Sequence, residues 1–105
     1  MELYHEIKEE AYVVILAGTL DGTNAPEIDI ALKKAIKSQK KEVIINCQNL
    51  KHITSAGIGI FLSNLPVIKE QGMELIFQGM NANIRKVFAM LGLDSLLKIS
   101  EPTTF

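Results

Sequence analysis

Three side chains in this sequence have the chemical types of a hydrolase triad, namely the serine Ser55, the histidine His52 and the acid Asp21. A nucleophilic serine of this kind usually lies in a Gly-x-Ser-x-Gly turn. Here Ile53 stands two residues before Ser55, so the first glycine is missing. With only two histidines in the chain, there is also little choice of a general base. We therefore predict no catalytic residue and no enzyme, and keep a small serine hydrolase only as a remote alternative.

Metal and nucleotide sites also need residue patterns that this sequence lacks. Zinc sites require several thiolates, imidazoles or carboxylates that converge, whereas Cys47 is the only cysteine. Gly57 and Gly59 suggest a phosphate-binding loop, but Leu62 stands where a third glycine would be expected, and no Gly-Lys-Ser/Thr sequence follows. We expect neither a metal nor a cofactor, and Cys47 reads as a buried, unreactive thiol.

Ser55 lies where a loop turns into an amphipathic helix. The segment 52–62 leads from polar residues into a pattern with Ile58 and Phe61 on one face. A serine at such a position is first of all a helix cap, which contributes about 0.5 to 2 kcal/mol. The residues alone leave two interpretations open, a cap or an exposed hydroxyl that another protein can modify.

The elements that position Ser55 follow from hydrophobic periodicity. Strands are expected over residues 3–8, 12–17, 43–47, 73–77 and 96–99, with a turn over 46–51. Helices are expected to start at a cap by Asn24, near Ser55 and at Asn81, the last with Ile84, Val87, Phe88 and Leu91 on its buried face. This order predicts an α/β fold with a mixed, mostly parallel sheet of 4–5 strands and helices packed against it.

Composition limits the class of protein. The chain has 105 residues, of which 48% are apolar and 22% charged, which predicts one globular domain over residues 1–105. No apolar run approaches the roughly 20 residues that cross a bilayer, and the acidic start does not resemble a secretory signal. A net charge of −1 provides no general attraction for phosphates. We expect a cytoplasmic protein that binds neither nucleic acid nor membrane.

Several motifs together resemble the STAS domains of bacterial anti-sigma-factor antagonists. These are the turn 18–21 (Gly-Thr-Leu-Asp), the strand 43–47, the helix entry 53–59 (Ile-Thr-Ser-Ala-Gly-Ile-Gly) and the helix end 87–93. The similarity runs from the first strand to Leu93, which is nearly the whole chain. It implies a STAS-like fold and a role in signal transduction and transcription regulation through protein binding.

The resemblance also implies a phosphorylation switch at Ser55. This residue matches the serine that is phosphorylated by a partner that is both anti-sigma factor and kinase. The unphosphorylated protein would bind that partner and release the sigma factor, phosphorylation would end the binding, and a serine phosphatase would restore it. The expected partner-binding residues are Asp21, Thr54, Gly57, Gly59, Ile60 and Asn64. The protein would be a monomer or a weak dimer.

Two positions depart from the family pattern, because Thr54 replaces the usual aspartate and Ala56 replaces a second hydroxyl residue. The family's carboxy-terminal helix is also expected to be missing, since the chain ends at Phe105. These departures support an alternative, a constitutive STAS binding subunit of a transporter or signalling assembly in which Ser55 is only a cap.

Overall fold

The structure, a computed structural model, describes residues 1–100 of the chain, and the expected absence of a carboxy-terminal helix concerns residues outside this range. Strands and helices alternate after an initial hairpin, as the sequence predicts. In chain order they are β1 (Glu2–Ile7), β2 (Ala11–Leu20), α1 (Ala25–Lys37), β3 (Glu42–Ile53), α2 (Ser55–Glu70), β4 (Glu74–Gln78), α3 (Ala82–Met90), a 3₁₀ turn (Leu93–Ser95) and β5 (Lys98–Ser100).

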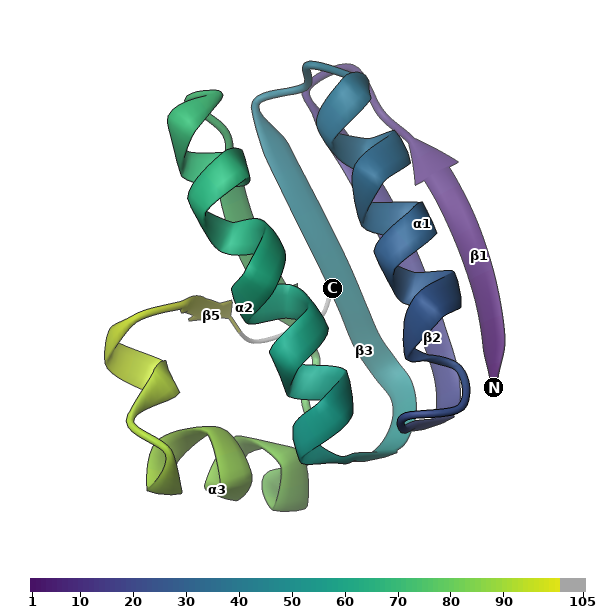
Figure 1. Cartoon of the computed structure of the whole chain (residues 1–105), viewed down its shortest axis with the longest axis vertical. Coiled ribbons are helices and arrows are strands. Elements are labelled where there is room, and N and C mark those ends of the chain that lie inside the picture. Colours follow the sequence, from purple (N-terminus) through teal and green to yellow (C-terminus); the bar gives the residue numbers. More distant parts are fainter. Residues whose placement is uncertain (101–105) are drawn as a thin grey trace, which may run out of the picture.

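The strands form one five-stranded sheet in the order β1-β2-β3-β4-β5. Strand β1 is antiparallel to β2, and the other neighbours are parallel. Helices α1 and α2 lie side by side over one face of the sheet, and α3 lies beside the start of α2 (Figure 1). The predicted mixed, mostly parallel α/β fold is therefore confirmed. None of the described helices is both long and apolar enough to span a membrane.

The hydrophobic core lies between this helical layer and the sheet. Phe77 of β4 joins the layers, because its ring stacks edge-on against Phe61 of α2 at 5.0 Å and against Phe88 of α3 at 5.4 Å. The stripe predicted for α1 is buried as a whole and consists of Ile28, Ala31, Leu32, Ala35 and Ile36. Burying one such leucine or isoleucine side chain contributes about 1.5–3 kcal/mol. This layer fixes how α1 and α2 sit on the sheet.

Strand β3 is longer than the sequence pattern indicates. A turn was expected over residues 46–51, but β3 stays paired with β2 until Ile53 pairs with Leu20. Two register irregularities in this pairing absorb the polar stretch, so Gln48 and Asn49 face solvent while Leu50 is buried. The consequence is that β3 carries the chain to within two residues of Ser55.

Candidate functional site

The site is built where β2 and β3 end and α2 begins. Thr54 is the N-cap residue of α2, in extended conformation with φ −97° and ψ 170°. Its N–H donates to the Leu20 carbonyl over 2.9 Å, and its own carbonyl accepts from Ile58 N–H over 3.0 Å. The end of β2 therefore fixes the point at which the helix starts.

Ser55 is the first residue inside α2 and not its cap. Its side chain is exposed, and its hydroxyl makes no hydrogen bond with any residue in the described range. The Thr54 side chain does not cap the helix either. The capping interpretation of Ser55 is therefore wrong, and its hydroxyl points to solvent at a helix N-terminus.

This placement predicts that Ser55→Ala leaves stability almost unchanged. A surface substitution without lost contacts changes the free energy of unfolding by no more than about 0.5 kcal/mol, whereas loss of a serine cap costs about 0.5 to 2 kcal/mol, and typically about 1 kcal/mol. Urea unfolding of the two proteins at neutral pH measures the difference. A loss above about 1 kcal/mol would restore the capping interpretation.

Asp21 forms a tight turn between β2 and α1. Its Oδ1 accepts hydrogen bonds from Thr23 Oγ1 over 2.6 Å and from Thr23 N–H over 2.9 Å. These bonds, the hydroxyl bond first, lower the pKa of the Asp21 carboxyl below its ordinary value. The site therefore carries a negative charge at neutral pH.

Asn24 holds this turn in place. It is the N-cap residue of α1 as predicted, but its side chain does not cap the helix. Instead, Asn24 Oδ1 accepts from Asp21 N–H over 2.9 Å, and Nδ2 donates to the Thr19 carbonyl over 2.8 Å. A Cβ placed on Gly22 would lie 3.7 Å from Ala56 Cβ, so the turn abuts the first turn of α2. Asp21 and Ser55 thus belong to one surface.

The two glycines of α2 have different environments. Gly57 is buried, and a Cβ on it would lie 2.7 Å from Leu20 Cγ and 3.1 Å from Ile53 Cγ1. Gly59 is exposed, and apart from the adjoining residues and the backbone of α2 no atom lies within 4 Å of such a Cβ. The structure corrects the expectation that Gly57 contacts a partner, because this glycine allows close packing inside the chain itself. Gly59 and the half-buried Ile60 remain at the surface.

Asn64 is also not available to a partner. Its side chain is 1% exposed and joins α2 to α1. Nδ2 donates to Asp29 Oδ1 and to the Ile60 carbonyl, each over 2.9 Å, while Oδ1 accepts from Lys33 Nζ over 2.7 Å. A buried amide needs such partners, because leaving it unsatisfied costs about 1–3 kcal/mol. The predicted contact of Asn64 with a partner is therefore wrong, and its role is structural.

This polar cluster predicts a pH dependence of stability. The hydrogen bond from Asn64, followed by that from Lys33, lowers the pKa of Asp29 from its ordinary 3.8. A carboxyl with a lowered folded-state pKa stabilises the fold above its unfolded-state pKa and loses that effect as pH falls through the folded-state pKa. Wild type should therefore exceed Asp29→Asn in free energy of unfolding at neutral pH. The difference should be under about 1 kcal/mol for this partly exposed group.

Urea unfolding of both proteins from pH 7 to below pH 3 checks this prediction. The difference between them should shrink below about pH 4. A difference that does not change with pH would show that the Asp29 charge contributes nothing.

Helix α3 exposes apolar side chains that the sequence pattern predicts to be buried. Val87 and Leu91 were expected on its buried face but are 37% and 57% exposed, and Met90 is 76% exposed. Only Ile84 and Phe88 of this nine-residue helix are buried. They are four residues apart, so they lie on the same face of the helix in successive turns and are its only contact with the core. We call Val87, Met90 and Leu91 the α3 patch. Val87 lines a small surface pocket with His52 and Ile53, so the patch adjoins the chain just before Ser55.

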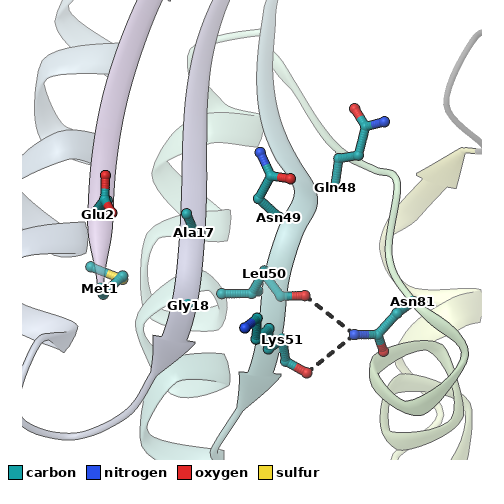
Figure 2. Close-up of a pocket in the computed structure, with 9 residues that line it drawn as sticks. All are labelled: Met1, Glu2, Ala17, Gly18, Gln48, Asn49, Leu50, Lys51 and Asn81. Carbon is teal, nitrogen blue, oxygen red and sulfur yellow. Dashed lines mark hydrogen bonds between the residues drawn. The ribbon is translucent and has the colours of Figure 1, made fainter.

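Asn81 fixes α3 against β3. Its Nδ2 donates to the carbonyls of Leu50 (3.2 Å) and Lys51 (3.1 Å), and its Oδ1 caps α3 by accepting from Ile84 N–H over 2.9 Å. Figure 2 shows these bonds at the border of a pocket of about 530 Å³ on the sheet face opposite the helices. The predicted start of α3 at Asn81 is confirmed, and this anchor holds the α3 patch beside the end of β3.

Within residues 1–100, no group of three or more histidine, cysteine or acidic side chains comes together as metal ligands do. Cys47 is 2% exposed, and burial raises the pKa of its thiol to about 12. Such a thiol stays protonated and unreactive at neutral pH. The described residues form a surface with one exposed hydroxyl, one carboxylate and an apolar patch, which suits the binding of another protein.

Known proteins are similar to this chain over most of its length. The model of the STAS domain family matches residues 3–103. An anti-sigma-B factor antagonist of Staphylococcus aureus (strain NCTC 8325 / PS 47) is 26% identical over 96 residues, covering 91% of this chain and 89% of that protein.

Two solved structures of SpoIIAA share the fold. The anti-sigma factor antagonist SpoIIAA in its unphosphorylated form superposes with a TM-score of 0.83 at 24% identity, covering 97% of this chain and 89% of its own. The Bacillus cell fate determinant SpoIIAA in the phosphorylated form gives 0.76 at 24% identity, covering 97% and 92%.

Proposed function

Because the chain belongs to the STAS domain family, we propose that it is an anti-sigma-factor antagonist controlled by phosphorylation of Ser55. The unmodified protein binds an anti-sigma factor that is also a serine kinase, and the sigma factor is released. Phosphorylated Ser55 prevents this binding until a serine phosphatase removes the phosphate. The name of the S. aureus relative and the two forms of SpoIIAA support the proposal. We further propose that residues 1–105 are a single STAS domain working in the cytoplasm.

The observation that carries the proposal is the Ser55 hydroxyl itself. It is exposed, makes no hydrogen bond to the described residues and sits on the first residue of α2. The first turn of a helix has unpaired N–H groups and the positive end of the helix dipole, which together favour a phosphate. The fold should therefore tolerate the modification while the surface gains about −1.5 to −2 charges.

The proposed docking surface surrounds this hydroxyl and has a polar side and an apolar side. We define it as Asp21, Thr54, Ser55, Gly59, Ile60 and the α3 patch. The patch provides the exposed apolar area that interface centres use, and the Asp21 turn provides a charged rim. Gly57 and Asn64 lie outside it because both are buried. A phosphate at Ser55 would lie inside this contact area and would have to lose water there without a partner charge.

Phosphate transfer tests the proposal directly. The protein is incubated with ATP and the serine-kinase anti-sigma factor of its own organism, and the modified residue is identified by mass spectrometry. Wild type and Ser63→Ala should take up one phosphate, whereas Ser55→Ala should take up none. The Ser63 variant is the matched control, because it removes another exposed hydroxyl of α2 that lies outside the docking surface.

Two results would contradict the proposal. Equal labelling of Ser55→Ala would place the acceptor elsewhere, and no labelling of wild type by a kinase that binds it would remove the switch. If substitution or phosphorylation of Ser55 did not change binding to the partner, the chain would instead be a constitutive STAS subunit of a transporter or signalling assembly. Thr54, in place of the family aspartate, is the residue that favours this second candidate.

A further inference from the structure

Strand β1 is the outer strand at one edge of the sheet, on the side of α1 and away from α2 and α3 (Figure 1). The side chains of β1 alternate along the strand between the two faces of the sheet. Leu3, His5 and Ile7 point to the helical face, and Glu2, Tyr4 and Glu6 point to the opposite face. Tyr4 and Ile7 are 53% and 66% exposed. Edge strands with such exposure pair readily with another chain unless something prevents it.

The backbone register shows which amides of β1 are unpaired. Lys8 N–H donates to the Ala11 carbonyl over 2.8 Å, and the antiparallel register pairs Ile7 with Tyr12 and Glu2 with Ala17. Because hydrogen-bonded and non-bonded pairs alternate in an antiparallel ladder, the even-numbered residues of β1 bond to β2. The N–H and C=O groups of Leu3, His5 and Ile7 therefore point away from the sheet.

We propose that a second copy of this chain pairs with that edge, forming a symmetric dimer through antiparallel β1–β1 contact with His5 on the two-fold axis. In this register Leu3 lies opposite Ile7 and His5 lies opposite its own copy, so all three outward-facing residues form hydrogen-bonded pairs. Glu2 lies opposite Lys8, and Tyr4 lies opposite Glu6. The two sheets join into one, with both helical layers on the same face.

The charged side chains of β1 favour this register over the two registers shifted by two residues. Only registers that pair odd-numbered residues with one another use the outward-facing amides. Moving the pairing by two residues in one direction places Glu2 opposite Glu6, and moving it in the other places Glu6 opposite Glu6 of the second copy. Like charges directly opposite each other destabilise a strand pair. Of these three registers, the one centred on His5 alone has no like-charge pair, and it makes two Glu2–Lys8 pairs.

A groove beside β1 gives the second copy a further contact. It has a volume of about 220 Å³ and lies between β1 and α1, and Ile30 in its lining is 59% exposed. Its lining is mixed, with the apolar residues Leu3, Ile30 and Ala31 beside the polar residues His5, Glu27 and Lys34. Since Leu3 lies opposite Ile7 of the other copy, that exposed isoleucine comes to the mouth of the groove. Pairing would remove Ile7 and Ile30 from water in both copies, a favourable burial.

The inference goes beyond the proposed function and does not depend on it. Strand β1 lies at the sheet edge away from α2 and α3 (Figure 1). Because Ser55 begins α2 and the α3 patch lies at the end of α3, the dimer leaves both uncovered. Ser55→Asp should therefore dimerise as wild type does. The phosphorylation switch and the dimer can therefore be tested, and can fail, independently of each other.

Sedimentation equilibrium over a wide range of concentrations tests the dimer. Wild type should show a reversible monomer–dimer equilibrium with a dissociation constant on the order of 100 μM, as expected for a small interface. Glu2→Lys and Lys8→Glu each place like charges opposite each other twice and should weaken the dimer at least about tenfold. The double variant Glu2→Lys/Lys8→Glu restores opposite charges and should recover most of the affinity. Ile7→Lys should also weaken it.

Matched controls separate the contact from a general change of charge. Glu70→Lys reverses an exposed charge at the end of α2, and Val67→Lys replaces a 43% exposed residue of the same helix. Both should dimerise as wild type does. A wild type that stays monomeric at millimolar concentration would overturn the proposal. Single variants as tight as wild type, or a double variant that shows no recovery, would overturn it as well.

Discussion

Replacing Ser55 by aspartate is expected to lower the affinity for the kinase-type anti-sigma factor about a hundredfold. This loss corresponds to about 2.7 kcal/mol of binding free energy. The variant itself should fold normally, because a carboxylate in the first turn of α2 is favoured by the helix dipole. In the complex the same charge would be buried in a close interface, where an unpaired charge is costly. Isothermal titration calorimetry with the purified partner measures the effect.

The matched controls for this prediction lie at the same position and on the same helix. Ser55→Ala keeps the surface uncharged and should bind within about threefold of wild type. Gln71→Glu adds a negative charge at the other end of α2, about 24 Å away by helical rise. It should bind as wild type does, because surface charges this far apart are screened. Equal weakening by Gln71→Glu would show that net charge, and not the position of Ser55, governs binding.

Gly57→Ala is expected to destabilise the fold by about 1–3 kcal/mol. The added methyl would lie 2.7 Å from Leu20 Cγ, closer than two carbon atoms can approach, and 3.1 Å from the Leu20 carbonyl oxygen. Leu20 is fully buried, and its carbonyl holds Thr54 N–H, so neither group moves without cost. Urea unfolding of the variant against wild type gives the free-energy difference.

Gly59→Ala is the control for this substitution, since it makes the same chemical change two residues further along α2. Apart from the adjoining residues and the backbone of α2 itself, no atom would lie within 4 Å of the new Cβ, so only the backbone effect remains. Alanine is favoured over glycine inside a helix by roughly 0.5–1 kcal/mol, and Gly59→Ala should stabilise the protein by this amount. If both variants gained stability, Leu20 would not be in close contact with α2.

The order of strands and helices could be predicted because each element has its own clear period. Apolar residues in 28–36 repeat at helical spacing, and the expected strands 43–47 and 73–77 are short, mostly apolar segments bounded by polar residues and a glycine. The extension of β3 to Ile53 could not be predicted in the same way. Its last residues are polar, and they stay in the sheet only because β2 offers a continuous partner across two register irregularities.

The errors at the site have a common physical origin in α2 and α3. Helix α2 has apolar residues on more than one face, so its sequence does not show that Asn64 points to α1. The bonds from Asn64 to Asp29 and Lys33 cross between helices, and no local pattern contains them. The exposure of Val87 was missed for the opposite reason, because a helical stripe predicts burial only where another layer covers it.

The helix boundary at Ser55 was predicted to within one residue, and that residue matters. As a cap, Ser55 would have its hydroxyl bound to the backbone, whereas one position later the hydroxyl is exposed. The difference arises because the Leu20 carbonyl holds Thr54 N–H and so fixes Thr54 as the last extended residue. This long-range bond between β2 and α2 cannot be read from the local sequence.

The central claim is that a phosphate on Ser55 decides whether the partner can bind. Its most direct test is one sample carried through a cycle of phosphorylation by the kinase, purification and removal of the phosphate by a serine phosphatase. The affinity for the anti-sigma factor is measured at each stage. We expect a fall of about a hundredfold on phosphorylation, with full recovery after the phosphate is removed. An affinity that stays the same through a complete cycle at Ser55 would contradict the account.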